Sequence, residues 1–249
     1  MTNADVIIVG GGPTGLCAGA VLAKAGKRVI LFEKDNYVGG RACSTTYKGH
    51  VFDNGPHLPS REGHLEDIFA EIGKQFPNSW WDFKGTLIHR DGKWVYLMDL
   101  LDRQKLREMM EEMVATSYEE IAKLDSVPIK DWVADRCDEE GMHLFWWCVT
   151  QGTFAGTRYE DFSAGDILYF FKETFERLGG WGGLWACVEG GYSKLIQPLY
   201  DSIIENGGEV RTGTYVDEII IEDGKAVGVA IASGEKVVPT QILPLESIT

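Results

Sequence analysis

The sequence has no long hydrophobic run and none of the residue spacings that are typical of metal sites. No apolar stretch among its 249 residues approaches the roughly 20 residues that a membrane-spanning helix needs, so we expect no membrane span. Its five cysteines show no C-x-x-C spacing and its five histidines no H-x-x-x-H spacing, and we expect no metal site. The first residues lack a basic region followed by an apolar core, which predicts no signal peptide, a cytoplasmic location and reduced thiols. A redox pair that includes Cys43 is the alternative.

Positive charge is also scarce. The chain has 24 Lys and Arg against 38 Asp and Glu, for a formal net charge of -14. This balance argues against nonspecific binding to nucleic acid or to an anionic membrane surface. The positive potential that a bound phosphate needs must therefore come from groups close to the phosphate. The hydrophobic content of 44% is ordinary for a soluble globular protein, and the length suits one large domain or two small ones.

A glycine motif near the N-terminus carries the first functional signal. The apolar run Val6–Val9 predicts a strand buried on both faces, and Gly10-x-Gly12-x-x-Gly15 follows it before the chain turns helical. At this spacing Gly10 allows a tight turn, Gly12 lets backbone amides approach a pyrophosphate, and Gly15 lets the helix lie close to the strand. The helix N-terminus, with its unpaired N–H groups and partial positive charge, is expected to face the phosphates.

The residues after the motif complete a dinucleotide-binding pattern. The small residues Gly19 and Ala23 leave one face of the helix without bulky side chains, so that it can pack against a sheet. The helix is expected to end near Gly26. A second apolar strand at 29–32 ends in Glu33, whose carboxylate we expect to accept hydrogen bonds from ribose hydroxyls. The alternative is a glycine-rich turn that binds nothing.

Two further segments extend this pattern, Lys34 to Arg41 (KDNYVGGR) and the later run Asp53-Asn54-Gly55-Pro56-His57. Together with the first motif they resemble the FAD-dependent amine oxidase and phytoene desaturase superfamily. The resemblance implies an α/β fold, in which a Rossmann-like FAD-binding domain with a parallel sheet and a β-meander carries an inserted, mostly helical substrate domain. It favours FAD over NAD as the cofactor. The residues that it assigns to the cofactor are Gly10, Gly12, Pro13, Thr14, Gly15, Glu33, Lys34, Gly39, Gly40, Arg41, Asn54, Gly55, Pro56, His57 and Val216.

The resemblance also implies an enzyme, an oxidoreductase that moves two electrons from a small or apolar organic substrate to the flavin. FAD carries the difficult chemistry in such enzymes, and the protein orients the substrate against it. His57 is the one ionisable side chain that we expect near the flavin ring, where its pKa range suits an acid or a base. The alternative is a histidine that packs or hydrogen-bonds at the turn.

The middle of the chain contains helical and hairpin patterns. We expect a helix over 63–74, a hairpin of strands 86–89 and 93–97, and one long polar helix over 102–124. The apolar stripe of that helix predicts a core-facing surface. Between 144 and 185 the sequence is rich in aromatic residues, which form either a helical core or the wall of a substrate pocket. Both interpretations stay open here.

The last part of the chain is expected to return to the first domain. An apolar face of Leu195, Ile196, Leu199, Ile203 and Ile204 predicts a helix, 209–212 the third parallel strand, and 215–238 a three-stranded meander. The expected domains are 1–75, the first part of the FAD-binding domain; 76–185, the helical insertion; and 186–249, the return helix, third strand and meander.

The chain resembles only the N-terminal half or so of a full superfamily member. We therefore expect a homo-oligomer, or a hetero-oligomer with a chain that supplies the missing C-terminal half. Two other functions remain open: a regulatory or non-catalytic subunit that binds FAD or ADP without turnover, and an NAD-dependent dehydrogenase that uses only the first motif.

Overall fold

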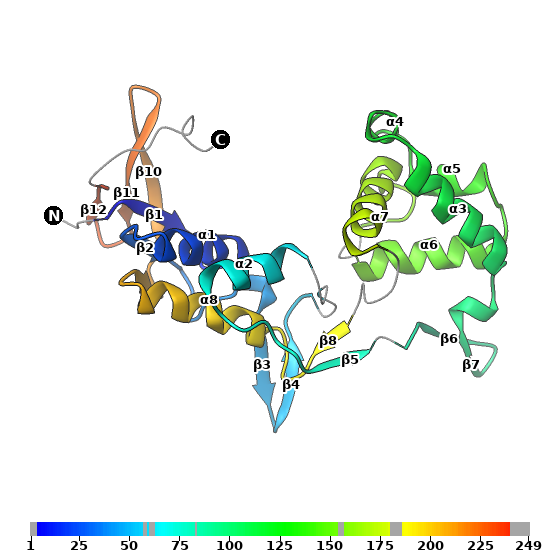
Figure 1. Ribbon diagram of the computed structural model, residues 1–249, viewed down its shortest axis with the longest axis horizontal. Coiled ribbons are helices and arrows are strands. Elements are labelled where there is room, and N and C mark those ends of the chain that lie inside the picture. Colours follow the sequence, from blue (N-terminus) through cyan, green and yellow to red (C-terminus); the bar gives the residue numbers. More distant parts are fainter. Residues whose placement is uncertain are drawn as a thin grey trace. The chain divides into compact units, whose positions relative to one another are not determined.

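The computed structural model of the protein describes residues 4–56, 59, 63–82, 84–153, 157–179 and 186–239. The chain divides into two compact units. The first unit combines Met1–Trp81 with Trp185–Thr249, and the second unit is Asp82–Leu184. Figure 1 shows the two units in sequence colours, with the second unit drawn mainly in green. Each is described separately below.

A parallel sheet of three strands forms the centre of the first unit. Its order is β1 (Val6–Val9), β2 (Val29–Phe32) and β9 (Glu209–Arg211), which confirms the predicted third parallel strand. All four residues of β2 are buried, because β2 has a neighbour on each side. The prediction that Val6–Val9 is buried on both faces is wrong. Among the described residues β1 pairs only with β2, and Val9 stays 50% exposed.

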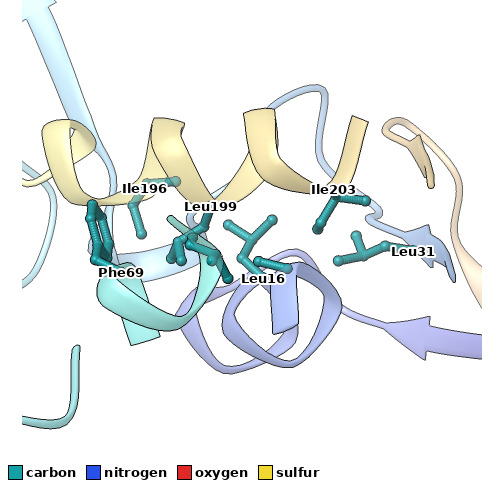
Figure 2. Close-up of a cluster of buried hydrophobic side chains, with 9 residues drawn as sticks. Leu16, Leu31, Phe69, Ile196, Leu199 and Ile203 are labelled. Atoms are coloured by element: carbon teal, nitrogen blue, oxygen red, sulfur yellow. The ribbon is translucent and has the colours of Figure 1, made fainter. Parts of the chain in front are cut away.

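Three helices cover one face of this sheet. They are α1 (Pro13–Lys24), α2 (His64–Ile72) and α8 (Ser193–Glu205), and their apolar side chains share one cluster with Leu31 of β2 (Figure 2). Helices α1 and α8 approach closely at Gly19, where an added Cβ would lie 2.8 Å from Cδ1 of Ile203. Four of the five apolar residues predicted on the return helix are buried, but Ile204 is 43% exposed.

The predicted meander covers the opposite face. It consists of β10 (Val216–Glu222), β11 (Lys225–Ile231) and β12 (Lys236–Val237), paired antiparallel in that order. Its residues Val229 and Ile231 pack with Ile30 and Phe32 of β2, whereas Leu31 packs toward the helices. Successive residues of a strand point to opposite faces, so β2 contributes to both cores.

Two small two-stranded sheets complete the first unit, of which the first is antiparallel. Strands β3 (Ser44–Tyr47) and β4 (His50–Asp53) form a hairpin after a short 3-10 turn, η1 (Gly40–Ala42). Strands β5 (Trp80–Asp82) and β8 (Ala186–Val188) also pair, although about a hundred residues separate them in the sequence.

The second unit begins with the predicted hairpin, β6 (Leu87–Arg90) and β7 (Lys93–Tyr96), followed by the 3-10 turn η2 (Leu97–Asp99). The prediction of one helix over 102–124 is wrong. Helix α3 (Arg103–Ala115) ends at Thr116, whose backbone is extended, and Ser117 starts α4 (Tyr118–Ala122) with a reciprocal capping box to Glu120. Helices α5 (Ile129–Ala134), α6 (Glu140–Thr153) and α7 (Ala164–Leu178) follow.

Aromatic side chains fill much of the core of the second unit. Trp146 on α6 is fully buried and meets Trp132 and Phe171 edge-to-face, with ring centroids 6.4 and 5.8 Å apart. The predicted apolar stripe of α3 is likewise confirmed, with Leu106, Met109 and Met113 buried. Phe154, Trp181 and Trp185 lie outside the described residues. No helix in the described part of the chain is long and apolar enough to cross a membrane.

Candidate cofactor site

The glycine loop between β1 and α1 has the geometry that its spacing predicts. Gly10 adopts φ +102°, and its N–H donates to the carbonyl of Phe32 at 2.8 Å. An added Cβ on Gly15 would overlap the carbonyl oxygen of Gly10, so the helix lies close to the strand only because residue 15 is glycine.

The N-terminus of α1 is open to a ligand. Its N-cap residue, Gly12, offers no side-chain hydrogen bond, and the first turn carries no acidic residue. An added Cβ on Gly12 would meet nothing within 4 Å, so open space lies beside the start of the helix. Pro13 begins the helix and Thr14 is exposed next to it. Free N–H groups and the positive end of the helix dipole meet at this place, which suits a phosphate or diphosphate.

Glu33 has a role that the sequence did not reveal. The residue is 94% buried, and its two carboxylate oxygens accept N–H groups from Gly11 at 2.7 Å and Asp35 at 2.8 Å. It thereby ties the glycine loop to the segment after β2. Each carboxylate oxygen has more than one acceptor site, so the predicted hydrogen bonds to ribose hydroxyls are compatible with this arrangement.

The Gly39–Arg41 segment packs directly on the glycine loop. The N–H of Gly39 donates to the carbonyl of Gly11 at 2.7 Å, and a Cβ on Gly40 would lie 3.4 Å from Cα of Gly12. Both Gly39 and Gly40 have positive φ, at +106° and +53°. The structure therefore brings together two motifs that are 24 or more residues apart in the sequence, and it leaves the side chain of Arg41 exposed.

The predicted Asn54–Pro56 segment lies against the same turn. Asn54 donates its backbone N–H to the carbonyl of Cys43 at 2.9 Å and its side-chain amide to Sγ of Cys43 at 3.0 Å. A Cβ on Gly55 would overlap the carbonyl oxygen of Arg41, which explains the glycine there. Pro56 is exposed, and His57 lies outside the described residues.

Two predicted residues lie apart from this turn. Lys34 is exposed, and its Nζ lies 3.4 Å from a carboxylate oxygen of Asp35. Val216 begins β10 opposite Ile231 and packs with the core on the meander side of the sheet.

A hydrogen-bond network that sequence reasoning missed joins the β3–β4 hairpin to α8. The N–H of Ser44 donates to Oγ of Ser193 at 2.8 Å, and the N–H of Ser193 donates to Oγ of Ser44 at 2.9 Å. Oδ1 of Asp53 accepts the hydroxyl of Ser44 at 2.7 Å and the N–H of Tyr192 at 2.8 Å. The first N–H groups of α8 are thus capped by a hairpin about 140 residues earlier in the chain.

Gly191 makes this network sterically feasible. It has φ +85°, and an added Cβ would lie 2.5 Å from Oγ of Ser44. In the sequence, the Gly190-Gly191 pair before the return helix was the available signal for a close contact. The pair did not indicate that the β3–β4 hairpin makes this contact. Burial raises the pKa of Tyr192, and the negative charge of Asp53 adds to the rise. Burial also raises the pKa of the Cys17 thiol on α1, as expected for a packing cysteine.

The glycine loop and the fold have counterparts in known proteins. Residues 8–72 match the family model of the NAD(P)-binding Rossmann-like domain, and the predicted α/β fold is confirmed.

The chain's homologues are phytoene and diapophytoene desaturases, which confirms the predicted resemblance. It is 23% identical to a 4,4'-diapophytoene desaturase of Methylomonas sp, in an alignment that covers 92% of this chain and 51% of that protein. It is 27% identical to the neurosporene-forming phytoene desaturase of Cereibacter sphaeroides, covering 94% of this chain and 51% of that protein.

Amine oxidases share the fold. Cyclohexylamine oxidase from Brevibacterium oxydans superposes with a TM-score of 0.67 at 22% identity, over 95% of this chain and 56% of that one. The chain therefore spans about half the length of the relatives that it matches.

Proposed function

We propose that this chain is the nucleotide-binding part of an FAD-dependent oxidoreductase that takes two electrons from a small or apolar organic substrate. The packing of Gly39–Arg41 on the glycine loop is the observation that carries this proposal. A Rossmann domain that binds NAD alone needs the glycine loop and the acid but not this second segment. The homology to desaturases supports the reaction class.

The described residues fit FAD. The open N-terminus of α1 would hold the diphosphate, and Glu33 the ribose. Gly39–Arg41 and Asn54–Pro56, which pack together, would line the path toward the flavin, with Val216 at the adenine end. Held by these residues, FAD would supply the two-electron redox chemistry for oxidation of the substrate. The contribution of the chain is to hold and orient both molecules and, at His57, to accept or donate a proton.

The remaining expectations stay part of this proposal. Residues 76–185 would form the substrate domain, and the protein would work as a homo-oligomer or with a chain that supplies the remaining half of a full-length relative. A second candidate function is a subunit that binds FAD or ADP without turnover.

The first test is the absorption spectrum of the purified protein, followed by denaturation and identification of the released molecule. We expect oxidised-flavin bands and released FAD. A colourless protein that takes up NAD or ADP but not added FAD would overturn the proposal. Electron transfer to an artificial acceptor, with a desaturase or amine substrate, separates the enzyme from the non-catalytic subunit.

A matched pair of glycine variants sharpens the test. Gly12→Ala adds a methyl group where the structure is open and a phosphate would approach, so we expect FAD to bind at least about tenfold more weakly, a loss of roughly 1.4 kcal/mol. Gly152→Ala adds the same methyl in open space on α6 and is expected to leave FAD affinity unchanged. Fluorescence titration of both proteins measures the difference.

A further inference from the structure

A cavity of about 630 Å³ lies in the first unit, separate from the glycine loop. Its walls come from the segment 36–38 after β2, from β3 with neighbouring Cys43 and Asn54, from the first two turns of α8, and from Thr212 after β9. The volume falls within the roughly 300–1,000 Å³ of small-molecule sites. Of the predicted cofactor residues that the structure describes, Asn54 alone lines it.

The chemistry of the wall is unusual for this chain. A quarter of the chain is charged, yet none of the thirteen lining residues is charged, and ten of them carry neutral hydroxyl or amide side chains. A charged ligand would gain no counter-charge from this wall. A neutral ligand with many hydrogen-bonding groups suits the wall.

Several of these groups are available to a ligand. Among the described residues, the hydroxyls of Thr46, Tyr200 and Thr212 and the amide of Asn36 form no side-chain hydrogen bond, although all four line the cavity. Gln197 uses only its Nε2 group, which donates to Asp201 at 2.9 Å. Unpaired polar groups that converge on one cavity are typical of a binding site with directional recognition.

Other parts of the wall are held in place. Ser44 and Ser193 line the cavity and are fixed to each other by the two reciprocal hydrogen bonds described above. Ile196 and Val38 add apolar surface beside the polar groups. These two serines therefore need little ordering when a ligand binds, which favours affinity.

We propose that this cavity binds a neutral, polyhydroxylated ring compound, such as a free sugar or the sugar of a nucleoside. The hydroxyl and amide groups would exchange hydrogen bonds with the ring hydroxyls, and Val38 and Ile196 would contact the apolar ring face. The proposal names other residues than the FAD proposal, with Asn54 shared among the described ones, although the cavity wall adjoins the cofactor segment where Cys43 and Ile196 pack against Gly39.

The test uses isothermal calorimetry of the whole chain with maltose and adenosine as probes. Gluconate and AMP serve as their charged counterparts. We expect at least one neutral probe to bind, and to bind at least about tenfold more tightly than its charged counterpart. Binding of maltose would indicate a free sugar as the ligand, and binding of adenosine would indicate the sugar of a nucleoside. Failure of both neutral probes, or equal binding of the charged ones, overturns the proposal.

Two single-hydroxyl variants locate the binding. Thr212→Val and Tyr200→Phe each remove one free hydroxyl, and each is expected to weaken binding about fivefold to tenfold. The matched control Tyr215→Phe removes an exposed hydroxyl outside the cavity and should not change binding. Circular dichroism shows which variants fold, and either cavity variant alone is sufficient for the test. Unchanged binding in a folded cavity variant, or displacement of the probe by saturating FAD, contradicts a separate site.

Discussion

In the first unit, glycines let backbone segments touch around the glycine loop and the β3–β4 hairpin, whereas the second unit combines such contacts, as at Gly141, with a core of aromatic side chains. Gly15, Gly55 and Gly191 each sit where an added Cβ would collide with a backbone or hydroxyl oxygen. In the second unit, Trp132, Trp146 and Phe171 meet edge-to-face in a core. A backbone contact demands one residue type, but a core accepts many combinations of similar volume. Motifs therefore reveal function in the first unit and reveal little in the second.

Gly15→Ala should have the largest effect and would test the backbone side of this comparison. Its methyl group would overlap the carbonyl oxygen of Gly10, so α1 must move away from β1. We expect the free energy of unfolding of the first unit to fall by several kcal/mol. This is enough to unfold the unit, since domains are stable by only about 5–15 kcal/mol. Thermal unfolding followed by circular dichroism measures this. Gly12→Ala, with open space at its Cβ, should melt within a few degrees of the parent; equal melting of both variants would refute the argument.

Trp146→Ala tests the side-chain half of the comparison. Removing a fully buried tryptophan should cost about 3–5 kcal/mol. Trp146→Phe should cost much less, because it keeps a ring in place and removes an Nε1–H that has no partner among the described residues. The neighbouring Trp147 is 47% exposed, so Trp147→Ala is the control and should have a small effect in urea unfolding. If Phe were as damaging as Ala at position 146, the core would depend on one specific residue after all.

Asp53→Ala breaks the cap that the hairpin supplies to α8. It leaves the hydroxyl of Ser44 and the N–H of Tyr192 without their acceptor, at a cost of about 1–3 kcal/mol. Asp53→Asn keeps an oxygen acceptor and should recover part of the stability. Asp217→Ala, an exposed change on β10, serves as control in the same urea titration. A loss in Asp217→Ala equal to that in Asp53→Ala would show that the cap contributes nothing.

The smallest effect is expected at the exposed pair of Asp5 and Arg28, 2.6 Å apart. Hydrogen bonds from the Arg28 side chain and backbone lower the pKa of Asp5 from 3.8 to about 2. Because the folded-state pKa is lowered, the stabilisation is present above about pH 4 and is lost as the pH falls toward 2. Asp5→Asn should therefore melt slightly earlier than the parent at pH 7, and the difference should vanish near pH 2. A difference that persists at pH 2 would assign the effect to something other than this charge.

The sequence predicted the features that depend on local residue types. The glycine loop, the third parallel strand at 209–211 and the meander follow from spacing and alternation, and the structure contains them. Other features depend on neighbours that are distant in the chain. Nothing within Val6–Val9 indicates that β1 pairs with one strand alone in the described part of the chain. The reciprocal hydrogen bonds of Ser44 and Ser193 join segments 149 residues apart. The break at Thr116 was missed for another reason, because the apolar stripe masked the capping box at Ser117.

The pairing of β5 with β8 has a consequence for how such a protein can change. The N–H of Glu189 donates to the carbonyl of Ser79 at 3.0 Å, so the chain departs from the first unit and re-enters it at adjacent points. Insertions are tolerated where their two ends lie close together, because the host closes the same short gap whatever the insert contains. We therefore expect the sequence of the second unit to tolerate divergence, lengthening or replacement while the glycine loop keeps its geometry.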